Sequence, residues 1–190
     1  MRLRAQGDRT SSRTRIAVFG KPGGGKSTLS QQIAAATKLP LHQLDLVQYQ
    51  RGGSKVPDEE FIKRHAEILA QERWVVDGFG NPRAFAAMLD AADVLVYVER
   101  FSLTHYWWVT KRLLKSPFSK PLGWPEGNPL LSSTISSYRF LRQSPRFWNS
   151  ALEAKLLALR PEKRVYVVRN ESDVAALLAE LGSWSASGEA

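Results

Sequence analysis

A glycine-rich stretch that ends in a lysine and two hydroxyl residues is the part of this sequence that points most directly to chemistry. Residues 18–28 read VFGKPGGGKST, and the spacing from Gly20 to Ser27 is G-x-x-x-x-G-K-S, the Walker A pattern. Glycines adopt positive φ readily, so such a loop wraps closely around an anion and points backbone N–H groups at phosphate oxygens. The alternative is a glycine-rich turn that a lysine follows by chance.

The segments around this loop favour phosphate binding. The run RIAVF (15–19) predicts a buried strand, and residues 27–39 carry apolar residues at helical spacing. Lys26 is then expected on the β and γ phosphates of a nucleotide, and the Ser27 hydroxyl on Mg²⁺. The predicted nucleotide contacts are Gly20, Gly23, Gly24, Gly25, Lys26, Ser27 and Thr28.

A magnesium site also needs a carboxylate at the end of a nearby strand. Asp77 closes the apolar run RWVVD (73–77) and is the predicted metal-binding carboxylate, together with Ser27. An aspartate that caps a turn is the other interpretation. The stretch DGFG (77–80) also fits D-x-x-G, by which GTPases sense the γ-phosphate, but no N-K-x-D tetrad follows a later strand. ATP and Mg²⁺ are therefore the expected cofactors.

Five short apolar runs alternate with helical patterns along the chain. The predicted strands are 15–19, 41–45, 73–77, 93–99 and 164–169. The later predicted helices are 82–92, 102–115, 131–159 with a break near Pro145, and a last one that Ser172 caps and Gly182 ends. This alternation predicts an α/β fold with a doubly wound, five-stranded parallel sheet. Residues 15–183 are expected to form one domain, with a basic tail at 1–14, a flexible tail at 184–190 and a helical lid at 102–148.

The overall charge favours partners that carry phosphate. The chain has 27 Lys and Arg against 18 Asp and Glu, a formal net charge of +9, which suits nucleotides or weak, nonspecific nucleic-acid binding. The sequence has no cysteine, which excludes disulfides and thiolate metal sites and is compatible with a cytoplasmic protein. No apolar run approaches the ~18 residues of a membrane span, so no membrane partner is expected. Monomer and homodimer both stay open.

Four pieces of the sequence carry a resemblance to a known family. They are GKPGGGKST, LHQLD, ERWVVDG, and a basic, aromatic segment after the fourth predicted strand that contains RFLRQSPRFW. With these pieces, residues 15–181 resemble the topology-modulation (FlaR-related) proteins, which are P-loop kinase-like relatives of adenylate kinases. The resemblance implies a nucleoside monophosphate kinase-like fold and an ATP-dependent activity.

Phosphoryl transfer requires cations beyond Lys26, because charge develops on the γ-phosphoryl oxygens. Between Lys111 and Arg146 there are seven Lys or Arg residues and a single acid, Glu126. This pattern is similar to the lid of adenylate-kinase relatives, whose arginines close over the phosphates. The resemblance implies catalytic roles for Arg112, Arg139 and Arg142; a solvated basic surface is the alternative.

Three further residues are candidates for binding the acceptor. Asp45 ends the second predicted strand, which is expected beside the first, and in related small-molecule kinases an aspartate there contacts the acceptor. Tyr49 follows it and lines the same expected pocket. Arg83 resembles the arginine that grips the acceptor phosphate in the D-G-F-P-R segment of adenylate kinases, although here Gly80 and Asn81 intervene before Pro82.

Three functions from different classes are compatible with these residues. The leading one is a kinase-like enzyme that moves the γ-phosphoryl group of Mg·ATP to a small acceptor, such as a nucleoside monophosphate. The second is an ATP-binding, nucleic-acid-associated protein of DNA topology modulation with slow, regulatory turnover. The third is a nucleotide-binding module without catalysis.

Overall fold

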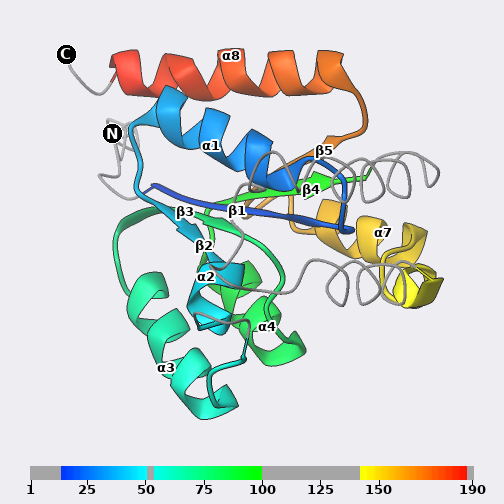
Figure 1. The fold of residues 1–190 in the computed structure, drawn as a ribbon. Coiled ribbons are helices and arrows are strands. Elements are labelled where there is room, and N and C mark those ends of the chain that lie inside the picture. The colour runs from blue at the N-terminus through cyan, green and yellow to red at the C-terminus, as the bar shows by residue number, and fades with distance from the viewer. Residues whose placement is uncertain (1–13, 51–53, 100–141, 188–190) are drawn as a thin grey trace, which may run out of the picture.

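The computed structural model describes residues 14–50, 54–99 and 142–187 (Figure 1). The predicted basic tail, Arg112, Arg139 and most of the predicted lid lie outside these ranges. The strands are β1 (Thr14–Gly20), β2 (Leu41–Gln43), β3 (Arg73–Asp77), β4 (Val94–Val98) and β5 (Arg164–Val168). The helices are α1 (Lys26–Thr37), α2 (Leu44–Gln48), α3 (Asp58–Leu69), α4 (Pro82–Ala91), α7 (Ser150–Ala158) and α8 (Glu171–Ser187), with a short 3₁₀ helix η1 (Ser144–Arg146).

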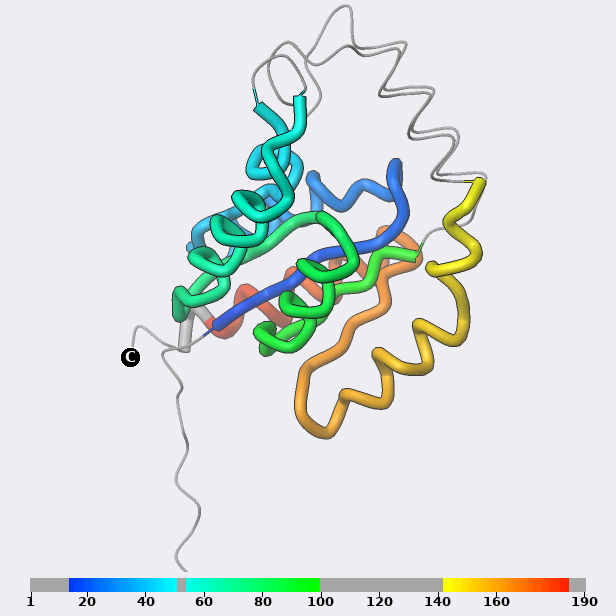
Figure 2. Tube along the Cα trace, turned by 90° about the horizontal axis from the view of Figure 1, so that it is seen from below, coloured from blue at the N-terminus to red at the C-terminus, as the bar shows by residue number. Residues whose placement is uncertain are grey.

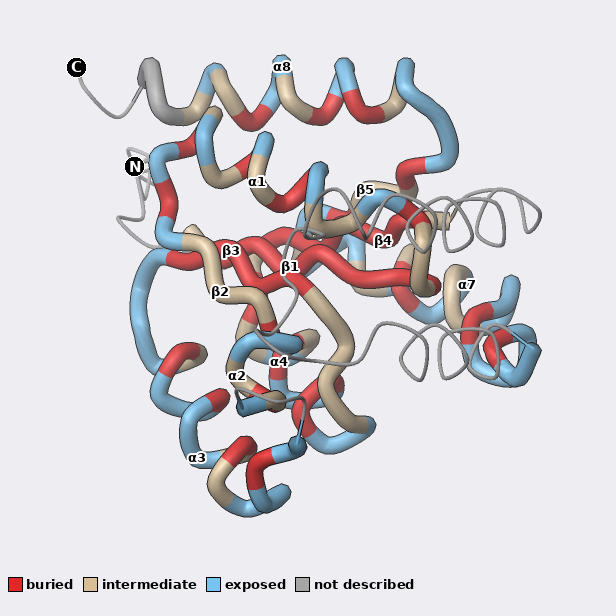
Figure 3. The backbone as a smooth tube through the Cα atoms, viewed as in Figure 1, coloured by how far each residue is buried: buried red, intermediate tan, exposed pale blue. Residues whose placement is uncertain are grey.

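The five strands form one parallel sheet in the order β2-β3-β1-β4-β5, which confirms the predicted α/β fold class. The three central strands, β3, β1 and β4, carry near-continuous buried runs, as expected where helices cover both faces of a parallel sheet, whereas the outer strands β2 and β5 are only partly buried (Figure 3). The break predicted near Pro145 is also present, because η1 ends at Arg146 and α7 begins at Ser150 with Asn149 as its cap.

Two predictions about the second strand were wrong. It ends at Gln43, and the chain turns at once into α2, so Asp45 lies in the first turn of a helix. The strand also pairs with β3 and not with β1, with Gln43 opposite Asp77. Local sequence patterns carry no information about which strand lies beside which, and an apolar run this short fits a strand or a helix equally well.

Two layers of helices enclose the sheet. In Figure 1, α1 and α8 lie above it, while α3, α4 and α7 lie below it, and the view from below in Figure 2 shows α4 in front of the sheet between α3 and α7. Alternate residues of β1 face the two layers. Ile16 and Val18 belong to the core that α1 and α8 cover, whereas Ala17 and Phe19 belong to the core that contains residues of α3, α4 and α7.

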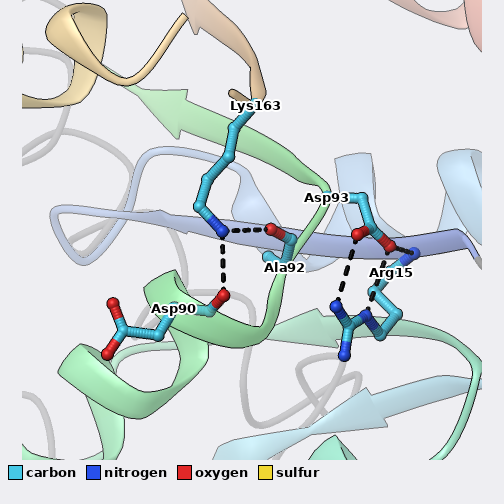
Figure 4. Close-up of polar contacts among 5 residues, drawn as sticks. All are labelled: Arg15, Asp90, Ala92, Asp93 and Lys163. Carbon is cyan, nitrogen blue, oxygen red and sulfur yellow. Dashed lines mark hydrogen bonds and ion pairs between the residues drawn. The ribbon is translucent and has the colours of Figure 1, made fainter. Parts of the chain in front are cut away.

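Polar contacts link β1, β4 and β5 at the amino edge of the sheet, where the strands begin (Figure 4). The Arg15 guanidinium donates to both carboxylate oxygens of Asp93, with Nε–Oδ2 at 3.2 Å, and the Arg15 backbone N–H donates to the same carboxylate at 3.1 Å. Lys163 Nζ donates to the carbonyls of Asp90 and Ala92 at 2.8 and 2.7 Å. These contacts join β1, the end of α4 and the start of β5.

The last helix differs from its prediction at both ends. The Asn170 side chain, and not Ser172, accepts from the N–H of Asp173, and the Asp173 carboxylate accepts from the N–H of Asn170 in return. The helix also continues through Gly182 to Ser187. A helical glycine costs only about 1 kcal/mol, and Trp184 packs on the core beyond it with the Arg164 guanidinium 4.2 Å from its ring centre. Within the described ranges, no helix has the length and apolar character to cross a membrane.

Candidate nucleotide-binding site

The glycine-rich loop joins the carboxyl end of β1 to the first residue of α1, as its motif requires. Gly20 has φ +147°, and a Cβ atom there would lie 2.2 Å from the carbonyl oxygen of Val98, so no other residue fits between β1 and β4 at this point. Gly25 has φ +80° and is the N-cap of α1. Because a glycine has no side chain to cap the helix, the N–H groups of the first turn face the loop and favour an anion.

Lys26 is the first residue of α1, and its ammonium group lies within the loop. Its Nζ donates to the backbone carbonyl of Lys21 at 2.9 Å, across the loop. Ser27 follows on the same turn and is half-buried, whereas Thr28 is exposed. The structure therefore places the side chain predicted to bind phosphate, Lys26, and one predicted to bind metal, Ser27, next to each other in the first turn of α1.

Asp77 is buried at the end of β3, directly beside this loop. It is only 5% exposed, and it lies opposite Val18 in the β1–β3 register. Burial raises the pKa of its carboxyl group; the Lys26 charge and side-chain hydrogen bonds with Ser27, Gln43 and Ser30 oppose that shift. Its Oδ1 atom is buried and has no hydrogen-bond partner. A buried carboxylate oxygen of this kind is costly unless it binds a cation or a ligand.

The Asp77 oxygen and the Ser27 hydroxyl fit Mg²⁺. Magnesium prefers oxygen ligands, and in nucleotide sites it is held by one or two protein groups while phosphates and water complete its shell. Among the described residues no group of three or more His, Cys, Asp or Glu could form an all-protein metal cage. The donor set therefore suits a metal ion that arrives with a nucleotide, with Asp77 and Ser27 as its protein partners.

The predicted acceptor residues lie in α2, directly after it, and in α4. Asp45 is exposed in the first turn of α2. Tyr49 forms an isolated bridge with Lys55, whose ammonium lies 5.6 Å from the centre of the Tyr49 ring. Arg83 is 71% exposed in the first turn of α4, where it forms a 3.7 Å ion pair with Glu59 of α3. Their roles in acceptor binding stay predictions.

The two residues that separate Asp77-Gly78-Phe79 from Pro82-Arg83 have a structural role. Gly80 has φ +66°, and a Cβ atom there would lie 2.8 Å from the Phe61 ring. Asn81 caps α4 by accepting a hydrogen bond from the N–H of Ala84 at 2.9 Å. Arg142, one of the three predicted lid arginines, is exposed shortly before η1, and its catalytic role also stays a prediction.

Sequence reasoning missed the polar groups that support the loop. Lys21 lies within the motif, and its ammonium pairs with Glu99 just after β4 at 2.7 Å. The Tyr97 hydroxyl donates to the other carboxylate oxygen of Glu99. Gln43 lies opposite Asp77 on β2. The pairing of strands determines each of these contacts, so a single sequence offers no direct signal for them.

Comparisons with known proteins agree with this geometry at the level of the fold. No protein-family profile matches the sequence, and no curated protein matches it either. A solved shikimate kinase from Acinetobacter baumannii, in complex with shikimate, is 14% identical, with a TM-score of 0.52 over 93% of this chain and 95% of its own. A solved sugar kinase from Janibacter sp., without ligand, is 13% identical, with a TM-score of 0.50 over 90% of this chain and 94% of its own.

The fold is therefore that of the P-loop kinases, as the glycine-rich loop and the sheet predicted. The two structures are small-molecule kinases, and the finer resemblance to the topology-modulation proteins stays a prediction.

Proposed function

We propose that this protein is an ATP-dependent phosphotransferase that moves the γ-phosphoryl group of Mg·ATP to a small hydroxylated acceptor. The observation that carries the proposal is the buried Asp77 carboxylate beside Lys26 and Ser27, whose Oδ1 atom has no hydrogen bond. A buried carboxylate next to a phosphate-binding loop can bind a metal ion whose other ligands are the phosphates of a nucleotide. The fold of small-molecule kinases supports the same class of reaction.

Each residue of the cluster has a separate task in this proposal. The loop N–H groups bind the phosphate chain, and Lys26 leaves its contact with the Lys21 carbonyl to bind the phosphates and offset the charge of the transferring group. Asp77 and Ser27 would hold Mg²⁺, which when bound would neutralise charge on the phosphate oxygens. The acceptor oxygen forms its bond to the γ-phosphorus as the bond to ADP breaks, and the acceptor proton is released.

The acceptor is a small molecule with a hydroxyl or phosphate oxygen as nucleophile. The matched structures include kinases of a sugar and of shikimate, and those substrates are properties of those proteins. For this chain we propose the class of small hydroxylated metabolites first and a nucleoside monophosphate second. Asp45, Tyr49 and Arg83 are the proposed acceptor contacts, and Arg112, Arg139 and Arg142 the proposed arginines of the lid.

The test is ADP formation with Mg·ATP across a panel of sugars, polyols, hydroxy acids and nucleoside monophosphates, with mass spectrometry of the phosphorylated product. We expect one acceptor class to raise ADP formation well above the rate without acceptor, and excess EDTA to abolish it. Turnover that no acceptor stimulates but duplex DNA does would support the nucleic-acid-associated alternative. ATP binding with no turnover under any condition would contradict the proposal.

A further inference from the structure

Two ion pairs bracket the pairing of β1 with β4. The register of these strands joins residues that are 78 positions apart, from Ile16–Val94 to Gly20–Val98. Arg15–Asp93 continues this register beyond the amino end, and Lys21–Glu99 continues it beyond the carboxyl end. The first pair lies at the amino edge of the sheet. The second joins Lys21 of the phosphate-binding loop to Glu99, the residue after β4.

The Lys21–Glu99 pair is unusually buried for two charged side chains. The side chain of Lys21 is 9% exposed and that of Glu99 is 23% exposed, with Nζ and Oε1 at 2.7 Å. The other Glu99 oxygen accepts from the hydroxyl of Tyr97, and the Glu99 N–H donates to the Val168 carbonyl at 3.0 Å, which ties the same residue to β5. Burial and the Glu99 carboxylate raise the pKa of Tyr97, which keeps its hydroxyl as a donor.

Lys21 also links this chain of contacts to the functional lysine. Its side chain binds Glu99, while its backbone carbonyl accepts from Lys26 Nζ at 2.9 Å. The position of the Lys21 backbone therefore sets where the Lys26 ammonium is held in the nucleotide-free protein. The stacked Tyr97 ring, 5.9 Å from Phe19 and 5.8 Å from Trp148 between ring centres, anchors the other end of the chain in the core.

We propose that Lys21, Glu99 and Tyr97 form a positioning unit that fixes the first half of the phosphate-binding loop to the end of β4 and preorganises it for the phosphate chain. The inference rests on the proposed nucleotide-binding role of the loop. A glycine-rich loop that is not fixed must lose conformational freedom when it binds an anion, and that loss reduces affinity. The unit removes part of this cost before the nucleotide arrives.

The test measures the affinity for ATP by calorimetry in the absence of Mg²⁺, so that the metal does not contribute and Asp77 is the same in every protein compared. Hydrogen exchange of residues 20–27 in the free protein is the second readout. Glu99→Gln keeps the shape and removes the charge, and Lys21→Met does the same from the other side. We expect each to weaken ATP binding roughly tenfold and to speed exchange in the loop. Lys21→Arg retains the charge and should restore most of the affinity.

Two further variants separate positioning from general stability. Tyr97→Phe removes only the hydroxyl and keeps the ring, so it serves if Glu99→Gln folds poorly, and it should weaken ATP binding by a smaller factor in the same direction. Asp93→Asn breaks the matched pair at the other edge and should leave loop exchange and ATP affinity unchanged.

Unchanged affinity and exchange in Glu99→Gln, while the wild type still transfers phosphate, would overturn this inference but not the proposed function. Weakened binding in a protein that transfers no phosphate would instead overturn the proposed function and leave the inference standing, and a wild-type protein that binds no ATP would overturn both.

Discussion

The two edges of the sheet use the same kinds of residues in opposite ways. At the amino edge, Arg15, Asp93 and Lys163 satisfy one another and the backbone around them. At the carboxyl edge, Asp77 keeps a buried oxygen without a partner. The glycines with positive φ in the described part of the chain also lie at this edge, namely Gly20, Gly23, Gly25, Gly78 and Gly80.

The difference shows where this fold accepts a cost in stability. An edge that only has to hold strands together can pair every charge, and its residues stabilise the fold. An edge that binds phosphate and metal, as we propose for this one, must keep backbone N–H groups and a carboxylate oriented toward a ligand. Its cost is a buried carboxylate oxygen that has no hydrogen bond in the free protein. We therefore expect equivalent substitutions at the two edges to have opposite consequences.

The largest expected effect is the loss of activity in Lys26→Ala. Removal of one preorganised charge from the transferring phosphates costs about 10²–10³ in turnover, or about 3–4 kcal/mol of barrier. Lys63→Ala, which removes an exposed lysine of α3, is the matched control and should keep full activity. Steady-state ADP formation measures both. Equal turnover of the two variants would mean that the loop is not where phosphate is transferred.

The next effect is on folding. Gly20→Ala places a Cβ atom 2.2 Å from the Val98 carbonyl oxygen and requires φ +147°, so β1 must move away from β4. We expect a loss of about 1–3 kcal/mol in the free energy of unfolding.

Gly182→Ala is the matched control. Its new Cβ meets no atom within 4 Å, and the change should stabilise α8 by about 0.5–1 kcal/mol. Denaturant unfolding of both variants checks this, and a neutral Gly20→Ala would show that the loop tolerates a side chain there.

A smaller effect is the change in stability at neutral pH when an aspartate at either edge is replaced by asparagine, and we expect it to have opposite signs at the two edges. The pKa of Asp77 is raised in the folded protein, so the native state binds a proton more tightly than the unfolded chain, and stability falls as pH rises through the raised pKa. Without metal and nucleotide, Asp77→Asn should therefore match the wild type at low pH and exceed its melting temperature at neutral pH. Asp93→Asn should lower stability at neutral pH by up to about 1 kcal/mol, as for a partly exposed pair.

Thermal melts of both variants from acid to neutral pH provide the comparison. The wild type in excess Mg·ATP serves as the control, because bound ligand should raise its melting temperature and offset the cost of the buried carboxylate. A destabilised Asp77→Asn at neutral pH would show that Lys26 and the polar neighbours of Asp77 outweigh the cost of burying its charge in the free protein.

Local patterns predicted the elements and the loop but not the contacts between them. The run RWVVD coincides with β3 from Arg73 to Asp77, because the three apolar residues between its charged ends are buried in the parallel sheet. The position of β2 beside β3 depended on the lateral order of the strands, which no local pattern encodes. The helix that contains Asp45 was not predicted, because the apolar run there is too short for its pattern to decide between strand and helix. Lys21 and Glu99 are 78 residues apart, and only the β1–β4 register brings them together.

The most direct test of the central claim is the effect of Mg²⁺ on ATP affinity, measured by calorimetry for the wild type, Asp77→Asn and Asp93→Asn. If the carboxyl edge is a site for Mg·ATP, the wild type and Asp93→Asn should gain affinity when Mg²⁺ is added. Asp77→Asn should lose most of that gain, about 10–100-fold, as is typical when a metal site loses a supporting partner, while it still binds ATP without Mg²⁺. The same Mg²⁺-dependent gain in all three proteins would contradict the account, because Asp77 would then be no part of a metal site.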